Sequence, residues 1–195
     1  MVTKNWLTAF VNECFVTAGS HAIEVRPATA RDVPLIEGWL NDPGNPLWQA
    51  KDLLQALSAP AYQLIVACDA RATGNNKVEN AVPVEQANAQ TPLGFALLRG
   101  VDNEWNLLYL LVAPAARRSG VAEALLQWLQ SNIAHEAGSL LLEVRCGNQA
   151  ATALYKKCGF VEQGVRPRYY EPLQVGGQRE DALLLGWNAV KLNKN

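Results

Sequence analysis

Residues 115–126 read AARRSGVAEALL and carry the sharpest local signal in the chain. They follow an apolar segment that ends at Val112, and the apolar spacing after Gly120 is that of a helix. A strand that passes through a glycine loop into a helix directs several backbone N–H groups into one concavity. The side chains of Arg117 and Arg118 add positive charge beside the helix dipole. The pattern suits a pyrophosphate-binding turn, but by itself it fits an ordinary strand-to-helix turn with solvated arginines at least as well.

The composition is that of one globular domain. The chain has 195 residues, of which 49% are apolar, and a formal net charge of −1. No basic run points to nucleic acid, and no acidic tail points to a charged partner. Apolar runs such as residues 107–116 are far too short to span a bilayer, and residues 1–20 make a poor signal peptide. We therefore expect a cytoplasmic protein with no nucleic-acid or membrane partner.

The sequence contains no metal-binding spacing. Only two histidines are available, and no two cysteines form a CxxC pair. We expect no metal site, and we expect free thiols, as in a reducing compartment, at Cys14, Cys68, Cys146 and Cys158.

The N-terminal extension, residues 1–20, is predicted to form an amphipathic helix. Apolar side chains such as Trp6, Phe10 and Phe15 recur at helical spacing over residues 4–18. That apolar face would pack either on its own domain or on another protein.

Strands and helices alternate along residues 21–190, which we interpret as a single domain. Strands are predicted at 22–28, 62–69, 92–100, 105–113, 140–145, 160–166 and 181–190, and helices at 29–40, 46–60, 121–137 and 149–158. Residues 71–90 lack periodicity and are predicted to be a mobile insertion within a hairpin, and residues 166–180 are predicted to be a long turn. This interleaving favours an α/β or α+β class with a mixed sheet, in three layers.

Two residues of the stretch LLLEVRCGNQAATALYKKCGF, residues 140–160, suit proton transfer. Glu143 lies in an otherwise apolar strand, where a carboxylate needs a partner or a task. Tyr155 follows on a short helix that begins after Asn148. The alternatives are a salt bridge from Glu143 to Arg145 or an edge position, and simple core packing for Tyr155.

The chain resembles a known family at four segments that occur in the family's order. RRSGVA fits the [Q/R]-x-x-G-x-[G/A] acyl-CoA loop of the GNAT N-acetyltransferases. The C-terminal half is most similar to the bacterial ribosomal-protein-alanine N-acetyltransferases, through LEVR, then N-x-x-A-x-x-L-Y-x-x-x-G-F, then YYEP and EDA. The match covers about residues 101–187. It departs at Ala122, where glycine is more common, and at residues 113–116, which lack an acidic residue often found there.

The resemblance implies a GNAT fold in which two neighbouring parallel strands splay apart and acetyl-CoA lies in the gap. It implies that the pantetheine arm pairs with backbone near Leu110, Leu111 and Val112. It implies that the pyrophosphate sits on Arg117, Arg118, Ser119, Gly120, Val121 and Ala122. Asn148 matches an asparagine beside the pantetheine arm, and a plain N-cap is the equal alternative for it.

The resemblance also implies the catalytic roles. Glu143 and Tyr155 sit where related enzymes carry their proposed general base and general acid, with Glu143 acting directly or through water. Tyr169 and Tyr170 match tyrosines that hold the acceptor peptide, and two surface tyrosines on a long hairpin are the alternative. Trp39 and Trp48 lie in the segment that flanks the other side of the acceptor cleft, and such tryptophans are more often core.

The chemistry of amines bears on the acceptor. An α-amino group has a pKa of about 7.7–8.0 against about 10.4 for lysine, so lysine would cost roughly 3 kcal/mol more to deprotonate. This favours transfer of acetyl from acetyl-CoA to the N-terminal amine of a protein, which the resemblance implies is ribosomal. The alternatives are acetylation of a small-molecule amine, and a non-catalytic acyl-CoA-binding subunit.

Overall fold

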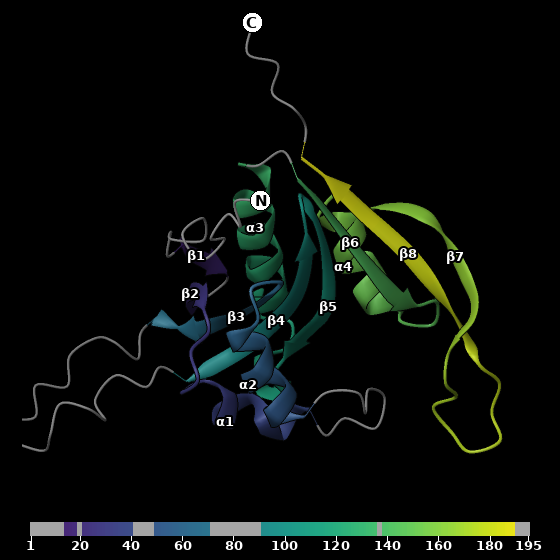
Figure 1. Cartoon of the computed structure of the whole chain (residues 1–195), viewed down its shortest axis with the longest axis horizontal. Coiled ribbons are helices and arrows are strands. Elements are labelled where there is room, and N and C mark those ends of the chain that lie inside the picture. Colours follow the sequence, from purple (N-terminus) through teal and green to yellow (C-terminus); the bar gives the residue numbers. More distant parts are fainter. Residues whose placement is uncertain (1–13, 19–20, 41–48, 71–90, 136–137, 190–195) are drawn as a thin grey trace, which may run out of the picture.

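A computed structural model describes residues 14–18, 21–40, 49–70, 91–135 and 138–189 (Figure 1). Within these residues eight strands form one mixed sheet in the order β1-β2-β3-β4-β5-β6-β8-β7. The strands are β1 Cys14–Ala18, β2 His21–Pro27, β3 Tyr62–Asp69, β4 Pro92–Val101, β5 Glu104–Val112, β6 Ser139–Arg145, β7 Val161–Tyr170 and β8 Glu180–Asn188. The α-helices are α1 Val33–Ile36, α2 Ala50–Ser58, α3 Val121–Ala134 and α4 Gln149–Lys157, with short 3₁₀ turns at Glu37–Trp39 and Pro114–Ala116.

Helices cover both faces of the sheet, so the predicted three-layer arrangement is confirmed. Strand β3 illustrates this arrangement, because its residues from Leu64 to Cys68 are all buried although they point alternately to the two faces of the sheet. Ile65 and Ala67 pack in one apolar cluster with α3 and α4, and Leu64, Val66 and Cys68 pack in a second cluster with α1 and α2. The interior therefore has two halves that share the sheet.

The N-terminal prediction is wrong where the structure describes it. Residues Cys14–Ala18 form strand β1, which pairs antiparallel with β2 from Cys14↔Val25 to Ala18↔His21. The segment reads CFVTA, and its aromatic and β-branched residues favour a strand once a neighbouring strand offers a ladder. The rest of the predicted helix, within residues 1–13, lies outside the described residues.

The predicted hairpin around the insertion is present at its two ends. Strands β3 and β4 pair antiparallel from Tyr62↔Arg99 to Cys68↔Pro92, as the sequence predicted. The insertion itself, residues 71–90, lies outside the described residues.

Strands β5 and β6 run parallel and then part, which forms the site described below. Their pairing begins at Glu104↔Ser139 and ends at Leu107↔Leu142. Beyond that point residues 108–112 of β5 do not pair with residues 143–145 of β6, and Figure 1 shows the two strands diverging. The splayed parallel strands implied by the family resemblance are therefore present.

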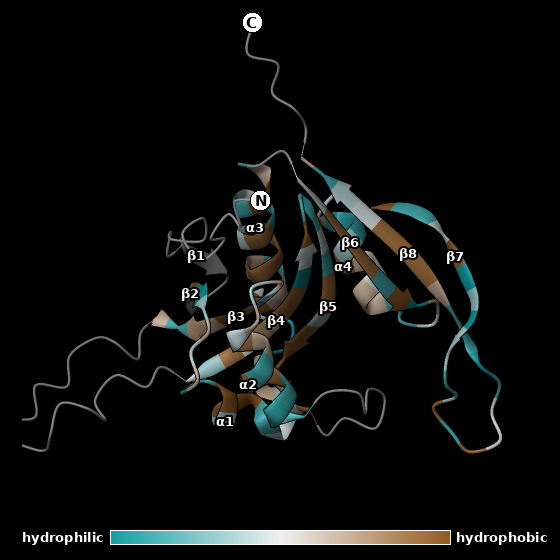
Figure 2. Cartoon of the chain, viewed as in Figure 1, coloured by the Kyte–Doolittle hydropathy of each residue, from teal (hydrophilic) through white to brown (hydrophobic). Residues whose placement is uncertain are grey.

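Strand β7, which forms the edge of the sheet beyond β8, is mostly polar. Figure 2 shows mostly apolar residues along α3 and the central strands, and mostly polar ones along β7. In β7 every residue from Val161 to Tyr169 is exposed, and the strand is held by its antiparallel pairing with β8. None of the helices in the described part of the chain is both long and apolar enough to cross a membrane.

Candidate active site

A cleft of about 1460 Å³ opens where β5 and β6 separate. Its walls come from β5, β6, α4 and β7, with Trp39 at one end. Most of the residues predicted from the sequence line it, namely Leu110, Leu111, Val112, Arg117, Ala122, Glu143, Asn148, Tyr155, Tyr169 and Tyr170. The remaining four are not among the lining residues; Arg118, Ser119 and Gly120 form the turn before α3, and Val121 is the first residue of that helix.

The turn before α3 is tight because two of its residues adopt left-handed backbone angles. Gly120 is the N-cap of α3 with φ 88°, and Arg118 has φ 62°. Ser119 Oγ donates to the carbonyl of Ala116 at 2.6 Å, which closes the loop. Val121 is buried and belongs to the core, so any contact that it makes with a ligand must come from its backbone N–H. The turn thus leaves the first N–H groups of a 14-residue helix for an anion.

The edge of β5 offers backbone groups to the cleft. Ala113 N–H donates to Leu93 O at 2.9 Å, toward β4. Because backbone groups alternate in direction along an antiparallel pair, those of Leu110 and Val112 face the open side. Arg117 Nε donates to Val112 O at 3.4 Å from that side, which agrees with this direction.

Asn148 caps α4. Its side-chain oxygen accepts from Ala151 N–H at 3.1 Å, so the N-cap interpretation is confirmed. The same residue lines the cleft, and a contact with a bound pantetheine stays a prediction.

Tyr155 is buried at the base of the cleft. Its ring packs edge-on against Phe160 at 5.6 Å between ring centres. Among the described residues its hydroxyl has no hydrogen-bond partner, although a buried hydroxyl normally has one. Burial raises the pKa of Tyr155, so the phenol stays protonated and can donate to a bound group.

Glu143 is held by a cation on a different strand from the one anticipated. Arg166 Nη1, on β7, lies 2.8 Å from Glu143 Oε1, whereas Arg145 pairs with Glu180 at 3.1 Å. Tyr169 also bonds to Glu143, and this hydrogen bond is the main cause of the raised pKa of Tyr169. The carboxylate is therefore oriented by two side chains of β7.

The two tyrosines belong to a strand and not to the predicted turn. Tyr169 and Tyr170 end β7, and their ring centres are 5.0 Å apart. The guanidinium of Arg145 lies 4.5 Å from the ring centre of Tyr170, and that of Arg166 lies 4.9 Å from Tyr169. Burial, followed by the nearby charge of Glu143, raises the pKa of Tyr170 to about 12. Arg166, Tyr169 and Tyr170 together are called the β7 wall below.

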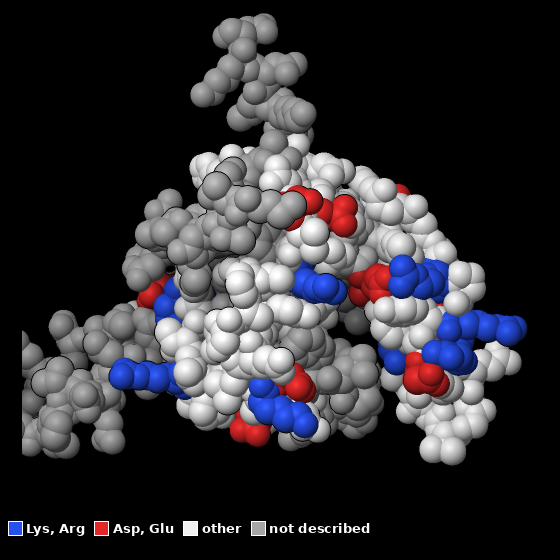
Figure 3. Space-filling view, viewed as in Figure 1, with Lys and Arg blue, Asp and Glu red and all other residues white. Residues whose placement is uncertain are grey.

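Charged side chains of both signs gather on the side of the molecule formed by β7 and β8, as Figure 3 shows. Glu171 pairs with Arg179 at 2.6 Å, and Glu162 pairs with Lys156 at 2.6 Å. Trp39 lies at the opposite side of the cleft, where it stacks on Phe95 at 6.4 Å, so it serves both core and lining. Trp48 lies outside the described residues.

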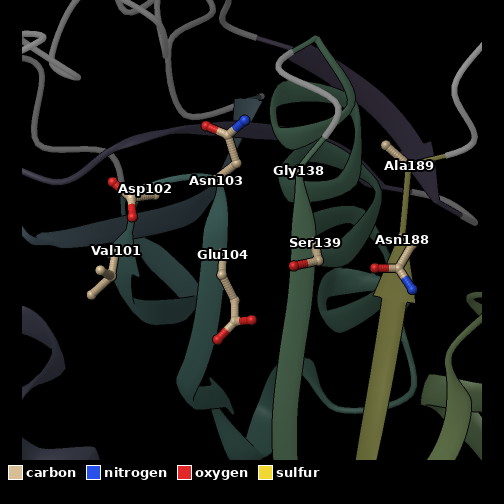
Figure 4. Close-up of a pocket in the computed structure, with 8 residues that line it drawn as sticks. All are labelled: Val101, Asp102, Asn103, Glu104, Gly138, Ser139, Asn188 and Ala189. Atoms are coloured by element: carbon tan, nitrogen blue, oxygen red, sulfur yellow. The ribbon is translucent and has the colours of Figure 1, made fainter.

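A second, smaller pocket of about 630 Å³ lies at the other end of the β5–β6 pair, where the strands are still joined (Figure 4). It contains none of the residues predicted for the site, and is lined by Val101, Asp102, Asn103, Glu104, Gly138, Ser139, Asn188 and Ala189. No group of three His, Cys, Asp or Glu side chains in the described residues is arranged to hold a metal ion.

Sequence reasoning missed two arginine contacts of the site, that of Arg166 with Glu143 and that of Arg145 with Tyr170. Both contacts join β6 to β7, although β8 lies between these strands in the sheet. A signal was available in RPRYY, because cations beside two aromatic rings often stack on them.

Comparisons with known proteins agree with this geometry. The model of the acetyltransferase (GNAT) family matches residues 48–160. The [ribosomal protein bS18]-alanine N-acetyltransferase of Escherichia coli (strain K12) is 39% identical over 92 residues, which cover 47% of this chain and 60% of that protein. The enzyme of that name from Haemophilus ducreyi is 31% identical over 112 residues, which cover 57% of this chain and 76% of the relative.

Two solved structures share the fold. The ribosomal-protein-S18-alanine N-acetyltransferase from Escherichia coli has a TM-score of 0.66 at 23% identity, over 89% of this chain and 97% of that one. A spermidine N-acetyltransferase from Vibrio cholerae, in complex with CoA and spermine, has a TM-score of 0.67 at 17% identity, over 86% and 95%. The family match covers more than half of the sequence and agrees with the splayed strands and the turn before α3. The chain therefore belongs to the GNAT family of acetyltransferases, as its motifs predicted.

Proposed function

We propose that this chain transfers an acetyl group from acetyl-CoA to the N-terminal α-amine of a protein, with a ribosomal protein as the candidate acceptor. The observation that carries the proposal is that Glu143, from β6, and Tyr155, from α4, line one cleft at the point where β5 and β6 part. The carboxylate of Glu143 can accept a proton, and the phenol of Tyr155 can donate one.

The residues present suit acetyl-CoA, which supplies an acetyl group on a thioester. The turn before α3, with Gly120 in a left-handed conformation, offers backbone N–H groups and Arg117 to the phosphates. The backbone groups of Leu110 and Val112 that face the cleft suit the amide-containing pantetheine arm. The unpartnered hydroxyl of Tyr155 suits a position beside the sulfur.

The two proton transfers are assigned as follows. The amine must be neutral to attack, and Glu143 accepts its proton, directly or through one water. The amine nitrogen bonds to the thioester carbonyl carbon, the carbon–sulfur bond breaks, and Tyr155 donates its proton to the departing sulfur. Glu143 then releases its proton to solvent, and the phenol of Tyr155 takes one up. Arg166 and Tyr169 keep the Glu143 carboxylate pointing into the cleft.

The charge pattern favours a protein N-terminus over a polyamine. A polyamine needs carboxylates for its additional ammonium groups. In the described residues at this end of the cleft, the carboxylates of Glu143, Glu171 and Glu180 are each paired with an arginine already. Two aromatic rings that line the cleft, the exposed Tyr169 and the half-buried Tyr170, suit a peptide chain. The relatives named for acetylation of a ribosomal protein add support.

The test compares three acceptors with acetyl-CoA and purified protein in the same buffer. They are a lysine-free peptide with a free N-terminal alanine, a peptide with a blocked N-terminus and one lysine, and spermidine. The proposal predicts turnover of the first at least about tenfold above the other two in kcat/KM. Preferred turnover of spermidine would establish acetylation of a small amine, and binding of acetyl-CoA without any turnover would establish a non-catalytic subunit.

A further inference from the structure

The end of strand β7 departs from regular pairing in a way that bears on the site. Arg166 pairs with Ala182, and the next pair is Tyr170 with Glu180. The chain therefore advances four residues on β7 but only two on β8 between these pairs. This is a β-bulge with two extra residues. Bulges bend a strand and turn side chains toward a new direction, and they are frequent next to active sites.

The bulge explains how two consecutive tyrosines reach the same cleft. In a regular strand successive side chains point to opposite faces of the sheet. Here Tyr169 contacts Glu143 and its neighbour Tyr170 contacts Arg145, and these two β6 residues, two positions apart, lie on the same face of the sheet. Regular alternation over Tyr169 and Tyr170 would turn one of the two rings away from that face.

One carboxylate holds the bulge. Asp181 Oδ1 accepts the backbone N–H of Arg168 at 2.8 Å, and Arg168 has φ 52°, a left-handed angle that is unfavourable for a residue with a side chain. The backbone carbonyl of Asp181 also accepts Cys146 N–H at 3.1 Å, so this residue joins the end of β6 to the bulge. Its neighbour Glu180 holds Arg145 and, at 2.6 Å, the N–H of Gly147.

We infer that Asp181 is a positioning residue for acceptor recognition, because its hydrogen bond to Arg168 N–H sets the bulge that keeps both tyrosines in the cleft. The inference rests on the proposed function for its kinetic consequence only. It also gives a role to Asp181 as part of the EDA segment, since the proposed chemistry does not use this residue.

The test uses two substitutions of Asp181 that differ in one property. Asp181→Asn keeps an oxygen that can accept from Arg168 N–H, whereas Asp181→Ala removes it. We expect Asp181→Ala to raise KM for the alanine peptide about tenfold, with KM for acetyl-CoA unchanged and Asp181→Asn within about threefold of wild type. Glu162→Ala, which removes a carboxylate of β7 outside the bulge, serves as the control.

Amide hydrogen exchange gives a second readout that needs no substrate. The Arg168 amide should exchange at least about tenfold faster in Asp181→Ala than in wild type and Asp181→Asn, with protection of β6 and β8 retained. An unchanged exchange rate, or an Asp181→Asn variant as impaired as Asp181→Ala, would overturn the inference. If wild-type protein acetylates neither peptide, the proposed function fails, and the exchange rates alone decide whether Asp181 holds the bulge.

Discussion

Arg166 Nη1 lies 2.8 Å from Glu143 Oε1, although strand β8 separates their two strands. The pairing registers explain how they meet. Glu143 is opposite Leu184, which is opposite Gly164 on β7, so the β7 position in the row of Glu143 has no side chain. Arg166, two residues further along the same face, can therefore extend over β8 to the carboxylate. The arrangement makes Arg166 the side chain that orients the proposed base.

Replacing Arg166 should therefore impair catalysis more than its exposed position suggests. We expect Arg166→Gln to lower kcat/KM for the alanine peptide about tenfold, because Glu143 loses an orienting partner and Tyr169 loses a stacked cation. Lys156→Gln is the matched control, since it also removes a cation from an exposed ion pair with β7, at 2.6 Å from Glu162. Steady-state kinetics of both variants decide the matter, and equal effects of the two would contradict the assignment.

Glu143→Gln tests the proton acceptor itself. The amide has nearly the shape of the carboxylate but accepts no proton, so kcat should fall by about 10²–10⁴-fold. Affinity for acetyl-CoA, measured by calorimetry, should stay within about threefold of wild type, because the turn before α3 is untouched. A variant that keeps a third or more of the wild-type kcat would exclude Glu143 as the base.

Tyr155→Phe tests the proton donor. The ring that packs on Phe160 is kept, and the deleted hydroxyl has no partner in the described residues, so the melting temperature should not fall. The value of kcat should fall at least about tenfold. Unchanged kcat with a lowered melting temperature would mean that Tyr155 only packs the core.

The pH profile of the wild-type protein follows from the same residue. Because burial raises the pKa of Tyr155, its proton is present throughout the range in which an α-amine, with a pKa of about 7.7–8.0, becomes neutral. The value of kcat/KM should rise through that range and show no loss up to about pH 10. A fall with a midpoint below about pH 9 would contradict a donor of raised pKa.

Stability should depend on a partly buried ion pair at the start of α1, between Arg26 and the buried N-cap residue Asp32. Asp32 is paired with Arg26 at 2.8 Å and also accepts from Thr29 N–H at 2.7 Å. Burial alone raises the pKa of Asp32, but the hydrogen bonds from Arg26 and Thr29 outweigh it, so the pKa is lowered overall. Asp32→Ala should cost about 1–3 kcal/mol at pH 7, because the partly buried guanidinium of Arg26 loses its carboxylate partner.

The sign of the pH effect follows from the lowered pKa. The contribution of Asp32 is fully present above its unfolded pKa of about 3.9, and it is lost as the pH falls through the folded value. Urea unfolding at pH 7 and at pH 3 should therefore show a smaller difference between wild type and Asp32→Ala at the lower pH. A difference that grows on acidification would contradict the ion pair.

The sequence predicted the parts of the site that depend on local order. The strand before Val112, the glycine turn at Gly120 and the N-cap at Asn148 are each set by neighbouring residues, and each is where it was expected. Strand β1 was missed because CFVTA continues a helical spacing, and its pairing with β2 prevails over that local pattern.

The β7 wall depends on contacts that no local pattern encodes. Regular alternation would place Tyr169 and Tyr170 on opposite faces, and the register of β7 with β8 shifts just before them, at the bulge that we propose Asp181 holds. Likewise, the partner of Glu143 could not be identified from spacing, because Arg166 is 23 positions away and on a strand that is not adjacent to β6.

One measurement tests the central claim most directly. A single peptide that carries both a free N-terminal alanine and an internal lysine is incubated with acetyl-CoA and the protein, and fragment-ion mass spectrometry locates the acetyl group. The account predicts one acetyl group, on the α-amine, which forms at least about a hundredfold more slowly when Glu143→Gln replaces the wild-type protein. Acetyl on the lysine side chain, or no acetylation of the peptide while spermidine is consumed, would contradict it.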